Sequence, residues 1–154
     1  MGETGDLGED EYRLVYSKVP RLTVDLILRD ERGAVFLTRR SSGPCRGLWH
    51  LPGGTVRFGE ALSDAVGRVA ARELSIEVRS MEQRGYIEYP SHYRAGLDSP
   101  VGLVFEIADF RGVPTINSEA TEGGWFEELP RDMHADQDDF LLQHGYLRSR
   151  TAET

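Results

Sequence analysis

The residues with the greatest chemical potential stand together between positions 51 and 73. The stretch at 51–60 reads LPGGTVRFGE and is followed by a predicted helix at 61–74. A glycine pair lets backbone N–H and C=O groups approach a ligand without an intervening Cβ, and the start of a helix offers unpaired N–H groups that favour an anion. Acidic and basic side chains follow at intervals, at Glu60, Arg68 and Glu73. This arrangement suits a diphosphate held by a divalent cation.

The predicted helix has an apolar stripe at the spacing i, i+3, i+4, i+7 and i+8, formed by Leu62, Ala65, Val66, Val69 and Ala70. Such a stripe predicts a helix that packs against a core. Glu73 continues the stripe. If Glu73 is buried, its carboxylate must be paired, hydrogen-bonded or bound to a metal. If the helix leaves the core in its last turn, Glu73 is solvated, and the pattern alone favours neither alternative.

Composition bounds the protein class. The chain of 154 residues has the length of one domain, and its net charge of −8 argues against binding to nucleic acid or to an anionic membrane. An anionic substrate therefore needs a local basic patch, for which arginines near the glycine pair are available: Arg39, Arg40, Arg46, Arg57 and Arg68. The single cysteine, Cys45, excludes an internal disulfide and is interpreted as a free loop thiol. A reducing, cytoplasmic location is expected.

The remaining chain predicts strands before and after the central helix. We expect strands at 22–28, 34–38, 84–89, 101–110 and 124–126, and a last helix at 136–144. This order predicts an α/β fold, an α/β/α sandwich around a mixed sheet. We expect a disordered N-terminus at 1–15, a single domain at 16–147 and a frayed tail at 148–154. The loop at 90–100 is the only long one that can fold over the site, and it contains His92.

These motifs resemble the Nudix hydrolase family, whose motif is G-x5-E-x7-R-E-U-x-E-E-x-G-U, with U a bulky aliphatic residue. Matches occur at Gly54, Glu60, Arg68, Glu73 and Ile76. The chain departs from the motif at Val69, Ala70, Arg72 and Ser75, so two of the usual three metal-binding glutamates are replaced. The segments GLWHLPGG at 47–54 and GWFEELP at 124–130 resemble the family's entry and exit segments.

The pattern of retained glutamates resembles one branch, the GDP-mannose mannosyl hydrolases, which also have an aspartate matched by Asp25 and a basic pair matched by Arg39 and Arg40. Members of that branch have an arginine directly after the glycine pair, where this chain has Thr55. They also have a glutamine–histidine pair before the exit tryptophan, where this chain has alanine and threonine at 120–121. The resemblance therefore implies the branch's metal site but does not identify the general base.

The resemblance implies a role for each candidate residue. Glu73 and the carbonyl of Gly53 would hold Mg²⁺ or Mn²⁺, Glu60 would support the loop, and Arg68 would fix the helix or the loop. Asp25 would bind sugar hydroxyls or a base. Phosphate would be held by Arg40 and Arg57, because Arg57 projects to the same side as Thr55 in an extended segment. Three residues are open as the base that activates water: Glu119, Glu122 and His92.

The expected function is therefore metal-dependent hydrolysis of a nucleoside diphosphate linked to another group, such as a sugar. The partner is this small molecule, with neither nucleic acid nor membrane, and a homodimer is one option. An alternative is a Nudix-fold binding module with little or no hydrolysis, which the replaced residues favour. A third interpretation, a broad pyrophosphatase of damaged nucleotides, is disfavoured because such enzymes rely on the carboxylates that this chain lacks.

Overall fold

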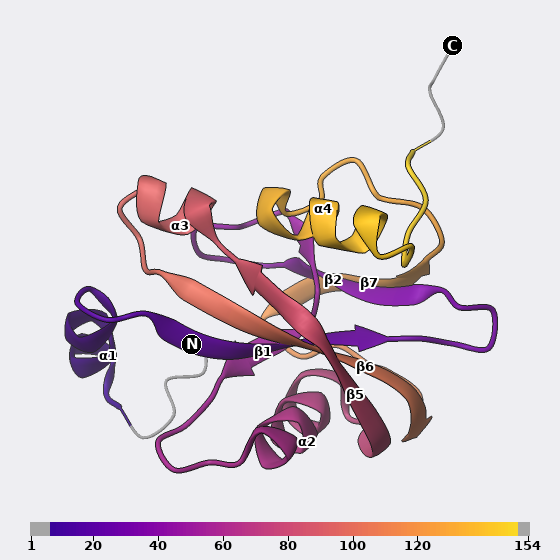
Figure 1. The fold of residues 1–154 in the computed structure, drawn as a ribbon, viewed down its shortest axis with the longest axis horizontal. Helices are drawn as coiled ribbons and strands as arrows, with labels where there is room; N and C mark the ends of the chain where they lie inside the picture. Colours follow the sequence, from indigo (N-terminus) through magenta and orange to yellow (C-terminus); the bar gives the residue numbers. More distant parts are fainter. Residues whose placement is uncertain (1–6, 151–154) are drawn as a thin grey trace.

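The central helix lies on one side of the sheets, as its apolar stripe predicts. The computed structural model describes residues 7–150. Helix α2 (Leu62–Leu74) covers one face of the strands, and α4 (Ala135–Gln143) lies on the opposite side (Figure 1). The predicted α/β/α sandwich is thereby confirmed. In the part of the chain that the structure describes, no helix is long and apolar enough to cross a membrane.

Two sheets form the middle layers. The first is mixed and has the order β4 (Gly53–Thr55), β1 (Arg21–Leu28), β6 (Pro100–Arg111) and β5 (Glu77–Glu88). In this sheet β1 runs parallel to β6, whereas β4 and β5 are antiparallel to their neighbours. The second is antiparallel and has the order β3 (Trp49–His50), β2 (Val35–Arg40) and β7 (Ala120–Phe126). Pairing of β1 with β4 places Asp25 opposite Gly53, so the first core strand positions the glycine pair.

Strand β1 is buried on both faces because each face meets a different apolar cluster. Val24, Leu26 and Leu28 pack with α2 in one cluster, and Ile27 packs with α4 in the other. The stripe on α2 is buried as expected at four positions, Ala65, Val66, Val69 and Ala70. Leu62 departs from the expectation, because 37% of its surface is exposed in the first helical turn. The buried positions of the helix run from Ala65 to Leu74, and Glu73 lies at the end of this range.

The chain ends differ from the sequence-based expectation. Helix α1 (Glu9–Tyr16) occupies much of the segment expected to be disordered. Its Tyr12 lies within 3.5 Å of Thr55 Oγ1, and the Arg21 guanidinium lies over the Tyr12 ring. These long-range contacts are invisible to composition, which is why the helix was missed. Arg148, expected in the frayed tail, exchanges backbone hydrogen bonds with residues 127 and 129. Residues 1–6 and 151–154 lie outside the described residues.

The loop at 90–100 contains a short helix, α3 (Pro90–Arg94), instead of irregular structure throughout. Asp136 at the start of α4 accepts hydrogen bonds from the Ser91 amide and hydroxyl, so α3 is held against α4.

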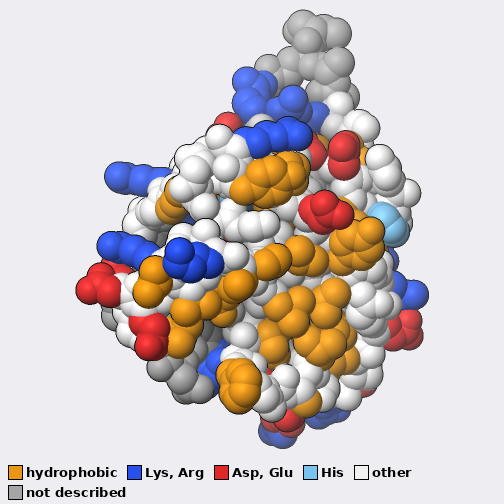
Figure 2. All heavy atoms as spheres, turned by 60° about the vertical axis from the view of Figure 1, so that its left-hand side comes forward, with side chains coloured by type: hydrophobic (Ala, Val, Ile, Leu, Met, Phe, Trp, Pro, Cys, Tyr) orange, Lys and Arg blue, Asp and Glu red, His pale blue; other side chains and the backbone are white. Residues whose placement is uncertain are grey.

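Figure 2 shows a face on which hydrophobic side chains gather in the middle and charged ones lie toward the edge. The homodimer suggested as an option stays a prediction.

Candidate functional site

Arg68 and Glu60 hold the glycine loop against helix α2. The Arg68 guanidinium donates to both Glu60 carboxylate oxygens, at 2.7 and 2.9 Å, and to the Thr55 carbonyl at 2.9 Å. Glu60 in turn accepts the Arg57 amide at 3.0 Å. Both side chains of the ion pair are largely shielded from water, with exposures of 19% and 13%. The pair therefore joins the loop to helix α2, and the catalytic roles that the resemblance implies for Arg68 and Glu60 stay predictions.

Glu73 is half-buried beside a second carboxylate, Glu119. Burial, together with the negative charge of Glu119, raises the pKa of Glu73 to about 7. Asn117 donates to Glu73 Oε2 at 3.2 Å, and its own side-chain oxygen accepts the Glu119 amide. Arg72, which replaces a family glutamate, lies 3.4 Å from Glu119 Oε1. Two adjacent carboxylates with only partial neutralisation make a site that a divalent cation stabilises.

A cavity of about 650 Å³ opens beside these carboxylates. It joins the glycine pair to segments far apart in sequence, among which are helix α1, the loop before β3 and the loop after α3. The lining residues with chemical relevance include Glu73, Glu119, Gly53, Gly54, Arg21, Arg40, Cys45, His92 and Asp98. The lining thus contains carboxylates and arginines, which are the ligand types that a cation and a diphosphate require.

The structure separates the predicted phosphate-binding arginines. Arg40 lines the large cavity and also a smaller neighbouring one, whereas Arg57 lines neither of these two. Arg21, which belongs to none of the motifs found in the sequence, lines both. Arg21 donates to Thr55 Oγ1 at 2.8 Å and to Asp98 at 2.6 Å. Thr55 therefore has a positively charged neighbour, and this neighbour is the Arg21 guanidinium from strand β1.

Among the candidate bases, the structure brings two to the cavity and leaves one outside. Glu119 and His92 both line the large cavity, as the sequence proposed. Glu122 lines neither of the two cavities and lies 3.6 Å from Arg39 in an exposed ion pair. Glu119 directly precedes β7 and Glu122 lies within it, so the two glutamates occupy different positions relative to the strand.

Asp25 is almost fully buried and lines the smaller cavity, of about 120 Å³. The Tyr89 hydroxyl donates to its Oδ2 at 2.5 Å, and Gln137 donates to the Tyr89 hydroxyl at 2.8 Å. A Cβ on Gly102 would lie 1.9 Å from the Asp25 carboxylate, so only glycine leaves room for it there. Burial raises the pKa of Asp25 to about 6, against the hydrogen bond from Tyr89.

Comparison with known proteins identifies the family. The model of the NUDIX domain matches residues 19–144. The chain belongs to the NUDIX domain family. The low-salt glycan biosynthesis protein Agl8 of Haloferax volcanii is 40% identical over 108 residues, which are 68% of this chain and 69% of that protein. With this family membership, the prediction of a Nudix-type hydrolase is confirmed.

Two solved structures have the same fold. The MutT NUDIX hydrolase from Burkholderia pseudomallei superposes with a TM-score of 0.74 at 25% identity, covering 82% of this chain and 98% of that chain. The NUDIX domain of Shewanella oneidensis NrtR, in complex with ADP ribose, superposes with a TM-score of 0.64 at 24% identity, covering 89% and 96%.

The Nudix glycine before the last aliphatic residue is Ser75 in this chain, and the backbone explains the family preference. Ser75 has φ of 57°, and it is the one non-glycine residue with positive φ among the described residues. It ends helix α2 in the left-handed conformation, where glycine avoids the strain of a Cβ. The serine therefore keeps the helix end that orients Glu73.

Sequence reasoning missed a cluster of side chains at the cavity wall. Cys45 has His92 and His134 as neighbours, and hydrogen bonds from His134 and His92 lower the pKa of its thiol to about 6. The hydrogen bond to Asp98, followed by the bond with Cys45, raises the pKa of His92 to about 9. No local spacing in the sequence signals this cluster, because any two of its three members are separated by 42–89 residues.

The burial of Asp25 predicts how the stability of the protein changes with pH. A folded-state pKa near 6, above the unfolded value of 3.8, means that the folded protein holds the proton longer, so this group lowers stability as the pH rises from about 4 to about 7. Asp25→Asn removes the titration. We expect the stability of Asp25→Asn relative to wild type to increase by about 2–3 kcal/mol across that range.

Urea denaturation of both proteins at several pH values measures this difference, in which other titrating groups cancel. Asp109→Asn, at an exposed position on β6, is the matched control and is expected to run parallel to wild type. Parallel curves for Asp25→Asn as well would mean that the buried carboxyl titrates at its ordinary pKa.

Proposed function

We propose that this protein hydrolyses a nucleoside diphosphate linked to a second group, and that the second group is a sugar. The observation that carries the proposal is the cavity in which Glu73 and Glu119 face the same space as Arg21 and Arg40. The relative from Haloferax volcanii, named for glycan biosynthesis, and the NrtR domain bound to ADP ribose support a sugar-linked diphosphate.

The side chains present fit a divalent cation such as Mg²⁺ or Mn²⁺, which enzymes of this family generally use. Glu73, with the carbonyl of Gly53, would hold it, and Glu119 adds a second carboxylate nearby. When bound, the cation neutralises the diphosphate as the substrate's leaving group or electrophile. Because Val69 and Arg72 replace two glutamates, we expect weak cation binding until the substrate supplies phosphate oxygens.

Arginines and loop residues position the substrate in this proposal. Arg40 binds phosphate oxygens, and Arg21 adds positive charge next to Thr55. Arg68 and Glu60 keep the loop in shape, and Arg68 does so through the Thr55 carbonyl at the wall of the cavity. Asp25, held by Tyr89 beside the smaller cavity, is the candidate to accept hydrogen bonds from the second group of the substrate.

Glu119 is the best candidate to accept a proton from the attacking water. It lines the cavity and lies against Glu73, whereas Glu122 lies in an exposed ion pair outside it. His92 lines the cavity too, but its pKa of about 9 means that it already carries a proton at neutral pH. A protonated imidazolium adds positive charge for an anionic substrate instead.

A substrate panel tests the proposal. NDP-sugars, dinucleotides and nucleoside triphosphates are each incubated with the protein and Mg²⁺ or Mn²⁺, and the released products are separated by anion-exchange chromatography. We expect an NDP-sugar to be the best substrate and a chelator to abolish its turnover, because the leaving diphosphate needs the cation. Identification of the product as NDP plus sugar, or as NMP plus sugar phosphate, also reveals which bond breaks.

The same panel contains the result that would overturn the proposal. Preference for a nucleoside triphosphate or a dinucleotide excludes the NDP-sugar assignment. Absence of turnover, together with nucleotide binding by calorimetry in the presence of a chelator, would support the binding module instead. Calorimetry therefore compares nucleotide binding with and without the cation, because a binding module can bind the nucleotide when no cation is present.

A further inference from the structure

We propose that Cys45, His92 and His134 form a second metal site, selective for Zn²⁺ or a similar transition-metal ion and separate from the Nudix carboxylates. The three ligand atoms, one sulfur and two imidazole nitrogens, lie within 4.8 Å of one another. Thiolate and imidazole are the ligands that zinc prefers, whereas Mg²⁺ prefers oxygen. This assignment does not depend on which substrate the enzyme hydrolyses.

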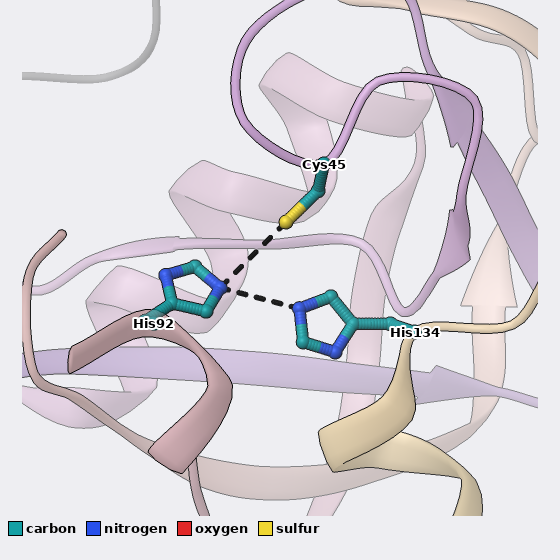
Figure 3. A group of neighbouring side chains, drawn as sticks. All are labelled: Cys45, His92 and His134. Carbon is teal, nitrogen blue, oxygen red and sulfur yellow. Dashed lines mark hydrogen bonds between the residues drawn. The ribbon is translucent and has the colours of Figure 1, made fainter. Parts of the chain in front are cut away.

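The three residues converge from separate parts of the fold. Figure 3 shows Cys45 reaching from the loop before β3, His92 from α3 and His134 from the start of α4, with their reactive atoms pointing toward one another. The hydrogen bonds between Asp136 and Ser91 hold α3 and α4 together at this point. Since both helices are anchored, the two histidines are positioned before any ion arrives.

Two of the three distances between ligand atoms are close to those of a tetrahedral site, and the third, between Cys45 Sγ and the His134 nitrogen, is within 4.8 Å. Cys45 Sγ lies 3.7 Å from His92 Nε2, and the two Nε2 atoms of His92 and His134 lie 3.2 Å apart. A tetrahedral zinc ion with ordinary bond lengths separates sulfur from nitrogen by about 3.6 Å and nitrogen from nitrogen by about 3.4 Å. An ion can therefore bind at the centre of the cluster with small side-chain adjustments.

A carboxylate behind His92 completes the arrangement that metal-binding histidines usually have. His92 Nδ1 lies 2.9 Å from Asp98 Oδ1, and Arg21 holds the other oxygen of Asp98 at 2.6 Å. With Nδ1–H donating to the carboxylate, Nε2 is left as the metal-binding atom. This carboxylate–histidine pair orients the ring toward Cys45.

His134 requires one change of protonation. Its Nδ1 accepts the Asp136 amide at 3.1 Å, which places the proton of the neutral ring on Nε2. Metal binding through Nε2 shifts that proton to Nδ1, where Asp136 Oδ2, 4.0 Å away, becomes its acceptor after a small rotation of the ring. In His92 the Nε2 proton of the imidazolium has to leave before Nε2 can bind the ion, so binding of the ion is accompanied by release of that proton from the cluster.

Three protein ligands leave a fourth coordination position open. Cys45 and His92 line the large cavity that also contains Glu73, so the open position is accessible from the substrate side. Structural zinc sites commonly have four protein ligands, whereas three ligands with one open position are typical of sites that bind water or a substrate atom. The proposed ion would place such a water in the wall of the cavity.

Cobalt provides the direct test, because the chain has a single cysteine. Co²⁺ added to the full-length reduced protein is expected to give a thiolate-to-cobalt charge-transfer band in the near ultraviolet, with one equivalent bound. One equivalent of Zn²⁺ should remove the band, and excess Mg²⁺ should not. Any such band has to come from Cys45, so its absence in wild type would overturn the proposal.

Variants separate this site from the rest of the protein. Cys45→Ser is expected to abolish the band, and His92→Ala and His134→Ala to weaken Co²⁺ affinity by more than about 100-fold. Asp98→Asn, which changes the group behind His92 and its ion pair with Arg21 but none of the three ligands, should weaken it by about 10–100-fold and keep the band. His144→Ala, a histidine stacked on Phe140 outside the cluster, and Glu73→Gln should leave the affinity unchanged. Full affinity in both histidine variants would refute the assignment.

A second measurement needs no substitution and so does not depend on whether the variants fold. Alkylation of Cys45 by iodoacetamide in the wild-type protein is followed by mass spectrometry with and without Zn²⁺. The proposed ion should slow alkylation at least about tenfold, because metal binding occupies the thiolate that reacts. An unchanged rate would show instead that the cluster is a thiolate–imidazolium group without a metal.

Discussion

Replacing Glu73 with glutamine is expected to lower kcat/KM for the best NDP-linked substrate by about 10²–10³. The amide keeps the size and one acceptor oxygen of the side chain but removes the charge that holds the cation. Because Val69 and Arg72 occupy the positions of two other family glutamates, few carboxylates remain to compensate. The loss is expected in kcat more than in KM, since the developing charge on the diphosphate is greatest in the transition state.

Glu122→Gln is the matched control for this experiment. Glu122 is a glutamate only three residues from Glu119, but it lies in an exposed ion pair with Arg39 outside both cavities. Its kinetics should stay within about twofold of wild type. Steady-state kinetics at saturating Mg²⁺ and Mn²⁺ titrations monitored by electron paramagnetic resonance measure both effects. Wild-type turnover in Glu73→Gln would remove Glu73 from the proposed cation site.

Arg68→Ala is expected to lower the free energy of unfolding by about 2–4 kcal/mol. The substitution leaves the Glu60 carboxylate, which is 13% exposed, without its cationic partner, and the Thr55 carbonyl loses a donor at 2.9 Å. The chain segment that loses support is the glycine loop, so activity should fall as well. Arg68→Lys keeps the charge but not the fork of two N–H groups on Glu60, and its stability should lie in between.

Urea denaturation followed by circular dichroism measures this loss. The control is Arg13→Ala, which breaks the exposed pair between Arg13 and Glu9 in helix α1. A pair exposed to water and screened by salt contributes little, so this control should change the free energy of unfolding by less than about 0.5 kcal/mol. If Arg68→Ala were no worse than Arg13→Ala, the Arg68–Glu60 pair would not hold the loop.

The candidate site was partly predictable because some of its parts are local. The spacing of Glu60 and Arg68 across the start of one helix placed them close enough to pair, and the structure shows that pair. For Glu73 the sequence left burial and solvation equally open. The structure places Glu73 between the two alternatives, half-buried, because Asn117 and Glu119 from a distant segment lie against it at the last turn of α2.

Arginines show the limit of reasoning from neighbours in sequence. Arg57 was expected to supply the charge beside Thr55 because alternation in an extended chain puts both side chains on one side. In the folded protein that charge comes from Arg21, 34 residues away, through the pairing of β1 with β4. Pairing between strands can bring a residue that is distant in sequence closer to Thr55 than a residue two positions away. The spacing of residues in the sequence does not reveal which strands pair.

The sequence by itself determined the α/β fold class, the buried stripe of α2 and the Nudix loop, since these follow from periodicity and spacing within short segments. Only the tertiary structure decided which acids reach the cavity and which groups surround Cys45. The thiol meets His92 and His134 because α3 and α4 pack against each other through Asp136 and Ser91. Such clusters depend on how distant elements pack, and packing is determined by the whole core rather than by any one segment.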